Sequence, residues 1–313
     1  MSSSSYNLTT ILPPDRFIFH AHPLYYSPSP SLIPFLSDPL LAALAPLPAY
    51  WLTSGFFHIL DSSTSPWLAR HRIHESSEVA SRNRATRLQV LRAVLFQQAL
   101  QTVLGILWVS EHPQEVDHAT AIRTIAHTIT SSSLSPSAFD DAAATLAYTL
   151  YWWLIPAAQL LVSMIVLDTW QYFLHRAMHL NRFLYKHLHS VHHRLYVPYA
   201  YGALYNHPIE GFLLDSLGAV LSETFAHLSV RQAMLFFVLS TCKTVDDHCG
   251  YRLPFDPFQL ISGNTADYHD IHHQVIGIKS NFSQPWFVHW DVILGTRMTR
   301  QDIEERREKL KTS

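Results

Sequence analysis

The sequence predicts an all-α integral membrane protein with about four membrane-embedded helical segments and a histidine-rich helical domain. Charged residues make up only 15% of the 313 residues, whereas a soluble domain carries roughly 25%. Long uncharged runs occur, and a helix needs about 20 apolar residues to cross a bilayer. Twelve of the 21 histidines lie between His175 and His273. The net charge is close to zero, which gives no case for a nucleic-acid partner.

Three uncharged runs define a transmembrane region over residues 39–168. Before it, residues 1–38 are rich in Ser, Pro and Tyr, and we expect an irregular lead-in without a cleavable signal peptide. The runs are residues 39–60, 93–110 and 142–167. Each is long enough to span a bilayer, and prolines in the first run are expected to kink it. We therefore predict two to three full spans here.

A fourth apolar region, residues 209–245, differs from the other three because charged side chains interrupt it. These are Glu210, Asp215, Glu223, Arg231 and Lys243. We interpret the region as a helical hairpin that re-enters the membrane or packs against the spans. Since ionisable residues are costly inside a bilayer, a pair of soluble core helices remains the alternative.

Basic residues indicate which side of the membrane each loop occupies. The loop after the second run holds a single basic residue, Arg123. The loop after the first run holds five arginines, Arg70, Arg72, Arg82, Arg84 and Arg87. Cytoplasmic loops carry the excess of Lys and Arg, so we expect the first loop to be cytosolic. The third span then returns the chain to the cytosol just before the histidine-rich domain.

Two kinds of short signal bear on location. The charged tail, residues 299–313, ends with Lys309 and Lys311 in the spacing of a di-lysine signal for return to the endoplasmic reticulum. That signal acts from the cytosol, where the predicted orientation places the tail. Asn7 and Asn281 begin glycosylation sequons. The same orientation places Asn7 in the lumen and Asn281 in the cytosol, so Asn281 is expected to carry no sugar.

Eight histidines form three clusters with helical spacing. They are His175 with His179, His189 with His192 and His193, and His269 with His272 and His273. Residues three or four apart share a helix face, so each cluster is expected to present two or three imidazoles to one point. Neutral imidazole binds Zn, Cu, Fe and Ni, and eight imidazoles exceed the needs of one tetrahedral site. The pattern predicts two adjacent metal ions.

The other histidines differ in their surroundings. His248 follows the fourth apolar region, and we predict it as a ninth ligand, with a supporting role beside the metal as the alternative. His187 points away from the face of its cluster and His207 stands in an Asn-His-Pro turn, so neither is expected to bind metal. Cys242 and Cys249 are expected to be free thiols. Scattered histidines without an assigned role are His20, His22, His58, His71, His74, His112, His118, His127, His227 and His289.

The three clusters in this order resemble the fatty acid hydroxylase superfamily of membrane di-iron enzymes, which includes sterol desaturases, sterol methyl oxidases and sphingolipid hydroxylases. A closer resemblance, over roughly residues 40–300, is to the fungal sphingolipid C4-hydroxylases, also called sphinganine C4-monooxygenases. The strings that carry it are VLDTWQYFLHR at 166–176, LYK at 184–186, YVPYAYGAL at 196–204, KTVDDHCGY at 243–251 and YHDIHH at 268–273. His187 and His207 depart from the family pattern.

The resemblance implies hydroxylation at C4 of sphinganine or dihydroceramide by a histidine-box domain over residues 169–298. It also implies two irons, O₂ as co-substrate, and residence in the endoplasmic reticulum membrane. No haem or dinucleotide fingerprint occurs in the sequence. Electrons from NAD(P)H are therefore expected through cytochrome b5 and its reductase, supplied in trans. No acid, base or nucleophile beyond the metal ligands is predicted.

Two alternatives stay open at this point. A sterol or fatty-acid desaturase or hydroxylase of the same superfamily would share every ligand and differ in its substrate pocket. A membrane metal transporter would also need histidines, but transporters hold their ligands within spans near the bilayer midplane. Here the histidine clusters follow the predicted spans, in polar sequence, which favours the enzyme.

Overall fold

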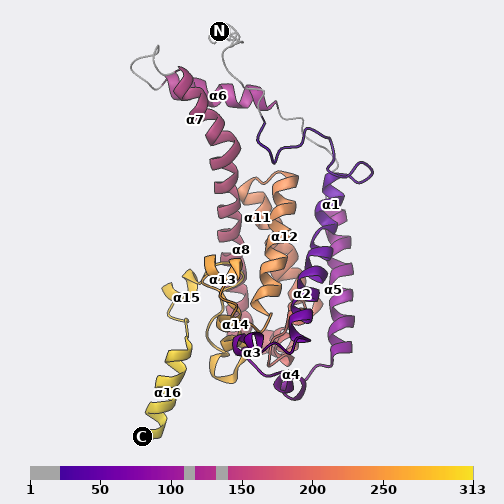
Figure 1. Cartoon of the computed structure of the whole chain (residues 1–313), viewed down its shortest axis with the longest axis vertical. Helices are drawn as coiled ribbons and strands as arrows, with labels where there is room; N and C mark the ends of the chain where they lie inside the picture. The colour runs from indigo at the N-terminus through magenta and orange to yellow at the C-terminus, as the bar shows by residue number, and fades with distance from the viewer. Residues whose placement is uncertain (1–21, 109–116, 132–139, 313) are drawn as a thin grey trace. The chain divides into compact units, whose positions relative to one another are not determined.

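The computed structural model describes residues 22–108, 117–131 and 140–312, and within these ranges the chain is helical (Figure 1). Its only β-structure there is two isolated bridges, Ile33 with Leu36 and Arg72 with Tyr251. The all-α prediction is confirmed for this part of the chain. Two compact units form, one from Met1–Leu32 with Glu111–Gln159 and the other from Ile33–Ser110 with Leu160–Ser313.

Three helices are long and apolar enough to cross a membrane, and they correspond to the three predicted runs. The first, Asp38–Asp61, consists of α1 (Asp38–Leu44) and α2 (Pro46–Asp61), which are separated at Ala45 where the proline pair begins. The second is α5 (Arg87–Trp108). The third, Ala142–Leu180, comprises most of α7 (Asp140–Thr149), the π-helical turn η2 (Leu150–Leu154) and α8 (Ile155–Leu180).

Helix α8 extends well beyond the predicted third run, which stops before Asp168. Asp168 lies inside the helix, where its buried carboxylate accepts hydrogen bonds from the backbone N–H groups of Trp286, at 3.1 Å, and Phe287, at 2.5 Å. The helix continues to Leu180 and carries two of the predicted ligands on its last turns. A buried acid is tolerated at such a position when donors satisfy it.

The region 209–245 forms a helical hairpin in which α11 (Leu217–Ala226) and α12 (Val230–Asp247) are joined by the short turn at residues 227–229 (Figure 1). His227 ends α11 in the left-handed conformation, and Ser229 begins α12 with a capping box. Helix α12 packs against α1 and α2. The hairpin is not among the three helices that meet the length and hydropathy of a span, so its contact with the membrane stays a prediction.

The basic loop between the first two spans packs onto the histidine-rich region of the same unit. It contains α3 (Pro66–His71) and α4 (Ser76–Arg82). Ile73 N–H donates to the Gly250 carbonyl at 2.9 Å, and the Asn83 side chain pairs with both backbone groups of Val197, at 2.8 and 2.9 Å. These contacts place the loop and the histidine-rich region at the same end of the spans.

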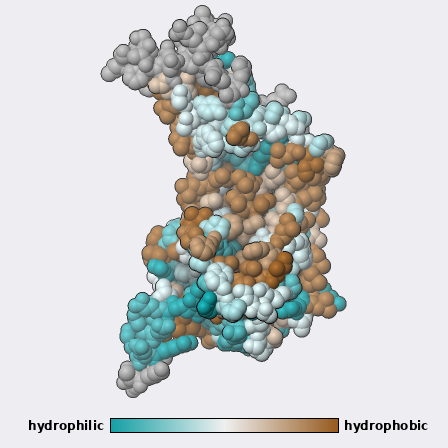
Figure 2. Space-filling model, in the orientation of Figure 1, coloured by the Kyte–Doolittle hydropathy of each residue, from teal (hydrophilic) through white to brown (hydrophobic). Residues whose placement is uncertain are grey.

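The remaining helices are short, apart from α6 and α16. They are α6 (His118–Ser131), α9 (Arg182–His187), η3 (His189–Arg194), η4 (Ala200–Gly202), α10 (Pro208–Gly211), η5 (Phe212–Ser216), α13 (Pro257–Ile261), α14 (Ala266–His273), η6 (Val275–Gly277), α15 (His289–Ile293) and α16 (Arg300–Thr312). In the larger unit, hydrophobic residues gather on the surface of the long helices and hydrophilic residues on α16 (Figure 2). Large apolar patches of this kind on helices suit contact with lipid.

The glycosylation sequons prove less informative than the sequence suggested. Asn281 is fully buried, and its side chain donates to the carbonyls of Tyr268 and Met298 at 3.0 and 2.9 Å. The folded protein therefore hides this sequon whichever side of the membrane it occupies, so a missing sugar does not report orientation. Asn7 lies outside the described residues.

Candidate metal centre

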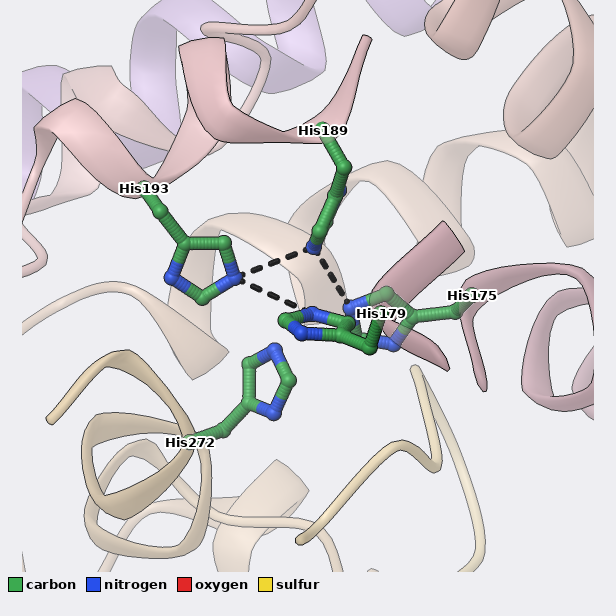
Figure 3. A group of neighbouring side chains, drawn as sticks. All are labelled: His175, His179, His189, His193 and His272. Atoms are coloured by element: carbon green, nitrogen blue, oxygen red, sulfur yellow. Dashed lines mark hydrogen bonds between the residues drawn. The ribbon is translucent and has the colours of Figure 1, made fainter. Parts of the chain in front are cut away.

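All nine histidines predicted as ligands converge in the larger unit. Helix α8 brings His175 and His179, the 3₁₀ helix η3 brings the second cluster, α14 brings the third, and His248 stands at the C-cap of α12. Their ligand atoms form two groups, and within each group these atoms all lie within 4.8 Å of one another. Group one is His175, His179, His189, His193 and His272 (Figure 3); group two is His192, His248, His269 and His273.

The prediction that each cluster presents two or three imidazoles to one point is confirmed, because each cluster places two rings in the same group. The second and third clusters also send one ring to the other group. His189 and His193 belong to group one, whereas His192 belongs to group two. In the third cluster, His272 belongs to group one and its neighbour His273 to group two. Adjacent residues on a helix point about 100–120° apart, so a histidine doublet directs its two rings to different places. Both HxxHH clusters therefore contribute to both groups.

Hydrogen bonds to backbone carbonyls fix the orientation of five rings. Each of these rings holds its Nδ1 against a carbonyl oxygen, so Nδ1 carries the proton in the neutral imidazole and Nε2 keeps a lone pair. The pairs are His175 with Phe282 (2.8 Å), His192 with Tyr205 (3.2 Å), His248 with Thr244 (2.8 Å), His272 with Ser280 (2.7 Å) and His273 with Leu195 (2.8 Å). This is the arrangement that metal-ligating histidines adopt.

The facing Nε2 atoms test whether a metal fits. Nε2 of His175 lies 3.0 Å from Nε2 of His189, and Nε2 of His192 lies 3.4 Å from Nε2 of His248. In each pair both Nδ1 atoms face an acceptor oxygen, so two lone pairs point at each other without a hydrogen between them. His272 Nε2 is also buried, without a hydrogen-bond partner in the part of the chain that the structure describes. A shared cation resolves this conflict, and imidazole nitrogen suits Fe or Zn.

Burial keeps the imidazoles in the form that binds metal. Burial, reinforced by the nearby His248, lowers the pKa of His192 to about 3. Burial likewise lowers the pKa of His248 to about 4, although its bond to the Thr244 carbonyl opposes the shift. Both rings are therefore neutral at neutral pH, and their lone pairs are available to a metal.

Glu210 is a site residue that the sequence analysis did not single out. Its Oε1 lies 2.5 Å from Nδ1 of His189, and both side chains are buried. A carboxylate in this position holds the ring and raises the basicity of the nitrogen that faces the metal. The signal in the sequence was the acidic residue itself, because an ionisable residue inside an apolar helical region indicates a candidate functional site.

His74 was assigned no role from the sequence, yet it supports the third cluster. Its Nε2 lies 2.8 Å from Oδ1 of Asp270, and its Nδ1 lies 3.0 Å from Glu78. Asp270 sits between two ligands of α14 and also pairs with Arg300. The basic loop and α16 are thus both tied to the helix that carries the third cluster.

Replacing Glu210 by Ala is expected to lower metal affinity about 10- to 100-fold, because His189 loses the carboxylate that orients it. Metal content measured against a graded chelator series tests this expectation. Glu223→Gln is the matched control, since Glu223 is another acid of the same hairpin outside both groups. Equal retention of metal by Glu210→Ala and the control would show that the contact with His189 is unimportant.

The histidines predicted not to bind metal lie outside both groups. His187 is exposed and packs against the ring of Phe183, with centroids 4.6 Å apart. His207 caps α10, where its Nδ1 accepts a hydrogen bond from Ile209 N–H at 3.2 Å, in agreement with the predicted turn. Cys242 and Cys249 are free thiols, as predicted.

Comparison with known proteins identifies the class of protein that has this helical fold and these histidine groups. The family model for fatty acid hydroxylases matches residues 160–296. Sphingolipid C4-hydroxylase SUR2 of Saccharomyces cerevisiae is 48% identical, over 86% of this chain and 74% of the relative. Sphinganine C4-monooxygenase 2 of Arabidopsis thaliana is 45% identical, over 83% of this chain and 88% of the relative.

A third relative carries a different name. Very-long-chain aldehyde decarbonylase GL1-9 of Oryza sativa subsp. indica is 40% identical, over 84% of this chain and 90% of the relative. No solved structure matches the chain. The chain belongs to the sphingolipid C4-hydroxylase family within the fatty acid hydroxylases, and the resemblance read from the histidine clusters is confirmed.

Proposed function

We propose that this chain is a membrane monooxygenase that hydroxylates C4 of sphinganine or dihydroceramide. The products would be phytosphingosine or phytoceramide, and the reaction belongs to sphingolipid biosynthesis. The observation that carries the proposal is the pair of adjacent, buried imidazole groups in a chain of the sphingolipid C4-hydroxylase family. The names of the yeast and Arabidopsis relatives supply the substrate and the position of attack.

The two histidine groups would hold two iron ions, one in group one and one in group two. Bound iron would supply the activation of O₂ that attack on an unactivated C–H bond requires. The chain's own residues hold the imidazoles in place through carbonyls of the loop after η4, of α12 and of the loop after α14. Burial of the rings keeps bulk water away from the reacting carbon. Zinc is expected to bind the same rings in purified protein.

Hydroxylation consumes one O₂, two electrons and two protons, and it releases one water beside the alcohol. We propose that the electrons come from NAD(P)H through cytochrome b5 and its reductase. In that case the metal centre has to face the compartment that holds these donors. The contact between the arginine-rich loop and the histidine-box domain, residues 169–298, supports a cytosolic centre, since such loops stay in the cytosol.

The test is expression of the chain in cells that lack 4-hydroxylated long-chain bases. Mass spectrometry of the extracted lipids is expected to find phytosphingosine or phytoceramide with the wild type and none with His189→Ala. A desaturated base or sterol would favour the related desaturases, and a shortened hydrocarbon would favour the aldehyde chemistry in the name of the rice relative. Either product without a C4 alcohol would overturn the proposal.

We propose that the protein resides in the endoplasmic reticulum and that the tail of α16 returns it there. Replacing Lys309 and Lys311 by Ser is expected to let part of the protein reach later compartments, because the di-lysine spacing is lost. Immunofluorescence and glycan processing on a fused reporter measure this escape. The control replaces Arg306 and Arg307 by Ser, which removes the same charge and leaves the spacing intact. Retention of both variants would assign residence to the spans or a partner.

A further inference from the structure

A cavity adjoins both histidine groups where the membrane helices meet the histidine-rich region. Its lining includes His189 of group one and His248 of group two. The lining also includes Gln171 of α8, Asp215 of η5 and Thr244 of α12. A substrate whose reacting carbon stands beside the metal groups has this cavity next to it. Polar side chains here are therefore positioned to contact the substrate.

Two carboxylates of this cavity can accept further hydrogen bonds. Glu210 uses Oε1 for His189, but its buried Oε2 has no partner among the described residues. Asp215 accepts one hydrogen bond, from Gln101 Nε2 at 3.2 Å, and none of the described ion pairs includes it. Asp247, in contrast, is already paired with buried Lys243. Glu210 is buried and Asp215 is half-buried. A carboxylate in such a place without a paired cation calls for a donor from outside the described residues.

The chemistry of a long-chain base supplies such a donor at the right place. In sphinganine the reacting C4 lies next to C3, which carries a hydroxyl, and two carbons from C2, which carries an ammonium group. Bond lengths of about 1.5 Å keep these groups within roughly 4 Å of C4. When C4 stands beside the histidines, its polar neighbours must lie in the adjoining cavity. The long hydrocarbon chain then extends among the apolar helices.

We propose that this cavity binds the amino-alcohol end of the substrate, with the Asp215 carboxylate accepting hydrogen bonds from the ammonium group. The free Oε2 of Glu210 then accepts from a hydroxyl of the same substrate. This assignment rests on the proposed function and deepens it, because it makes the free base the preferred substrate. The amide of dihydroceramide has no charge to offset that of Asp215, and a charge-assisted hydrogen bond is about twice as strong as a neutral one.

Asp215→Asn tests the assignment in purified full-length enzyme, with sphinganine and dihydroceramide as separate substrates. The variant keeps the size of the side chain and its contact with Gln101, and it removes the charge. The KM for sphinganine is expected to rise roughly tenfold or more, with kcat changed less than about threefold. The KM for dihydroceramide is expected to stay within about threefold. Glu223→Gln, an acid-to-amide change outside the cavity, is expected to leave both KM values unchanged.

The outcomes separate this assignment from the proposed function. If the wild type forms no 4-hydroxylated product from either lipid, the proposed function fails. If the wild type is active and Asp215→Asn leaves the KM for sphinganine unchanged, or raises both KM values equally, only the ammonium assignment fails. Should the variant lose its metal, competition on the wild type replaces it. A deaminated long-chain 1,3-diol is expected to compete at least tenfold more weakly than sphinganine, and equal competition would overturn the assignment.

Discussion

Alanine at any one of the nine clustered histidines is expected to reduce hydroxylation on the order of 100-fold or more, while the protein still inserts into the membrane. Each ring supplies one donor atom to a compact group, and no described side chain stands ready to replace it. Product formation in microsomes measures the loss. His187→Ala and His207→Ala are the controls, and both are expected to keep most of the activity because neither ring reaches a group.

Adjacent histidines of the second cluster belong to different groups, so replacing each of them separately gives a sharper test of the two metal sites. His193→Ala removes a ligand from group one, and His192→Ala removes one from group two. Each variant is therefore expected to lose metal mainly from its own group, so iron per chain should fall from about two towards one in both. Double replacement should approach zero. Full activity in any two of the nine single variants would contradict the two-metal proposal.

Asp291→Ala is expected to cost on the order of 3 kcal/mol or more of stability, because several buried donors lose their acceptor. The carboxylate is fully buried and accepts from the backbone N–H groups of Phe282 (3.0 Å) and Ser283 (2.8 Å). It also accepts from the hydroxyls of Tyr268 and Thr296. The thermal midpoint in detergent should fall by roughly 10 °C, by the scaling for domains of this size.

The same variant is expected to disturb the metal site, since the Phe282 carbonyl holds Nδ1 of His175. Metal affinity should therefore fall together with the thermal midpoint. Asp302→Ala is the matched control, because Asp302 accepts from Thr299 at the partly exposed start of α16. Losing that cap should cost about 1 kcal/mol. A midpoint for Asp291→Ala equal to that of the control would show that the carboxylate does not brace the site.

The spans and the nine histidines were predictable because each leaves a local mark in the sequence. A charge-free run of bilayer length needs no tertiary information, and neither does a spacing of three or four between imidazoles. His248 was identified for a similar reason, since it stands directly after an apolar region. The hydrogen bonds of the Asp168 carboxylate were not predictable. Its donors are backbone N–H groups 118 and 119 residues further along the chain.

The division of the histidines into two groups could be predicted only in part. Helical geometry already implies that His192 and His193 point in different directions, yet spacing alone does not say where each ring finds its partners. The partners come from α8, α12 and α14, and only the packed structure brings these elements together. Glu210 was visible as a charge in an apolar region, but its contact with His189 depends on the turn that precedes η5.

The shared use of each HxxHH cluster constrains how these segments can change in length. An extra residue between His189 and His192 would rotate the doublet by about 120° in the 3₁₀ helix η3, so each ring would turn away from its own group. Insertions within a cluster would therefore disable both groups at once. The segment 274–281 carries no ligand, but the Ser280 carbonyl holds Nδ1 of His272 and the buried Asn281 side chain donates to two carbonyls. Length changes there would therefore misplace His272 as well, so intolerance to insertion should extend beyond the ligands themselves.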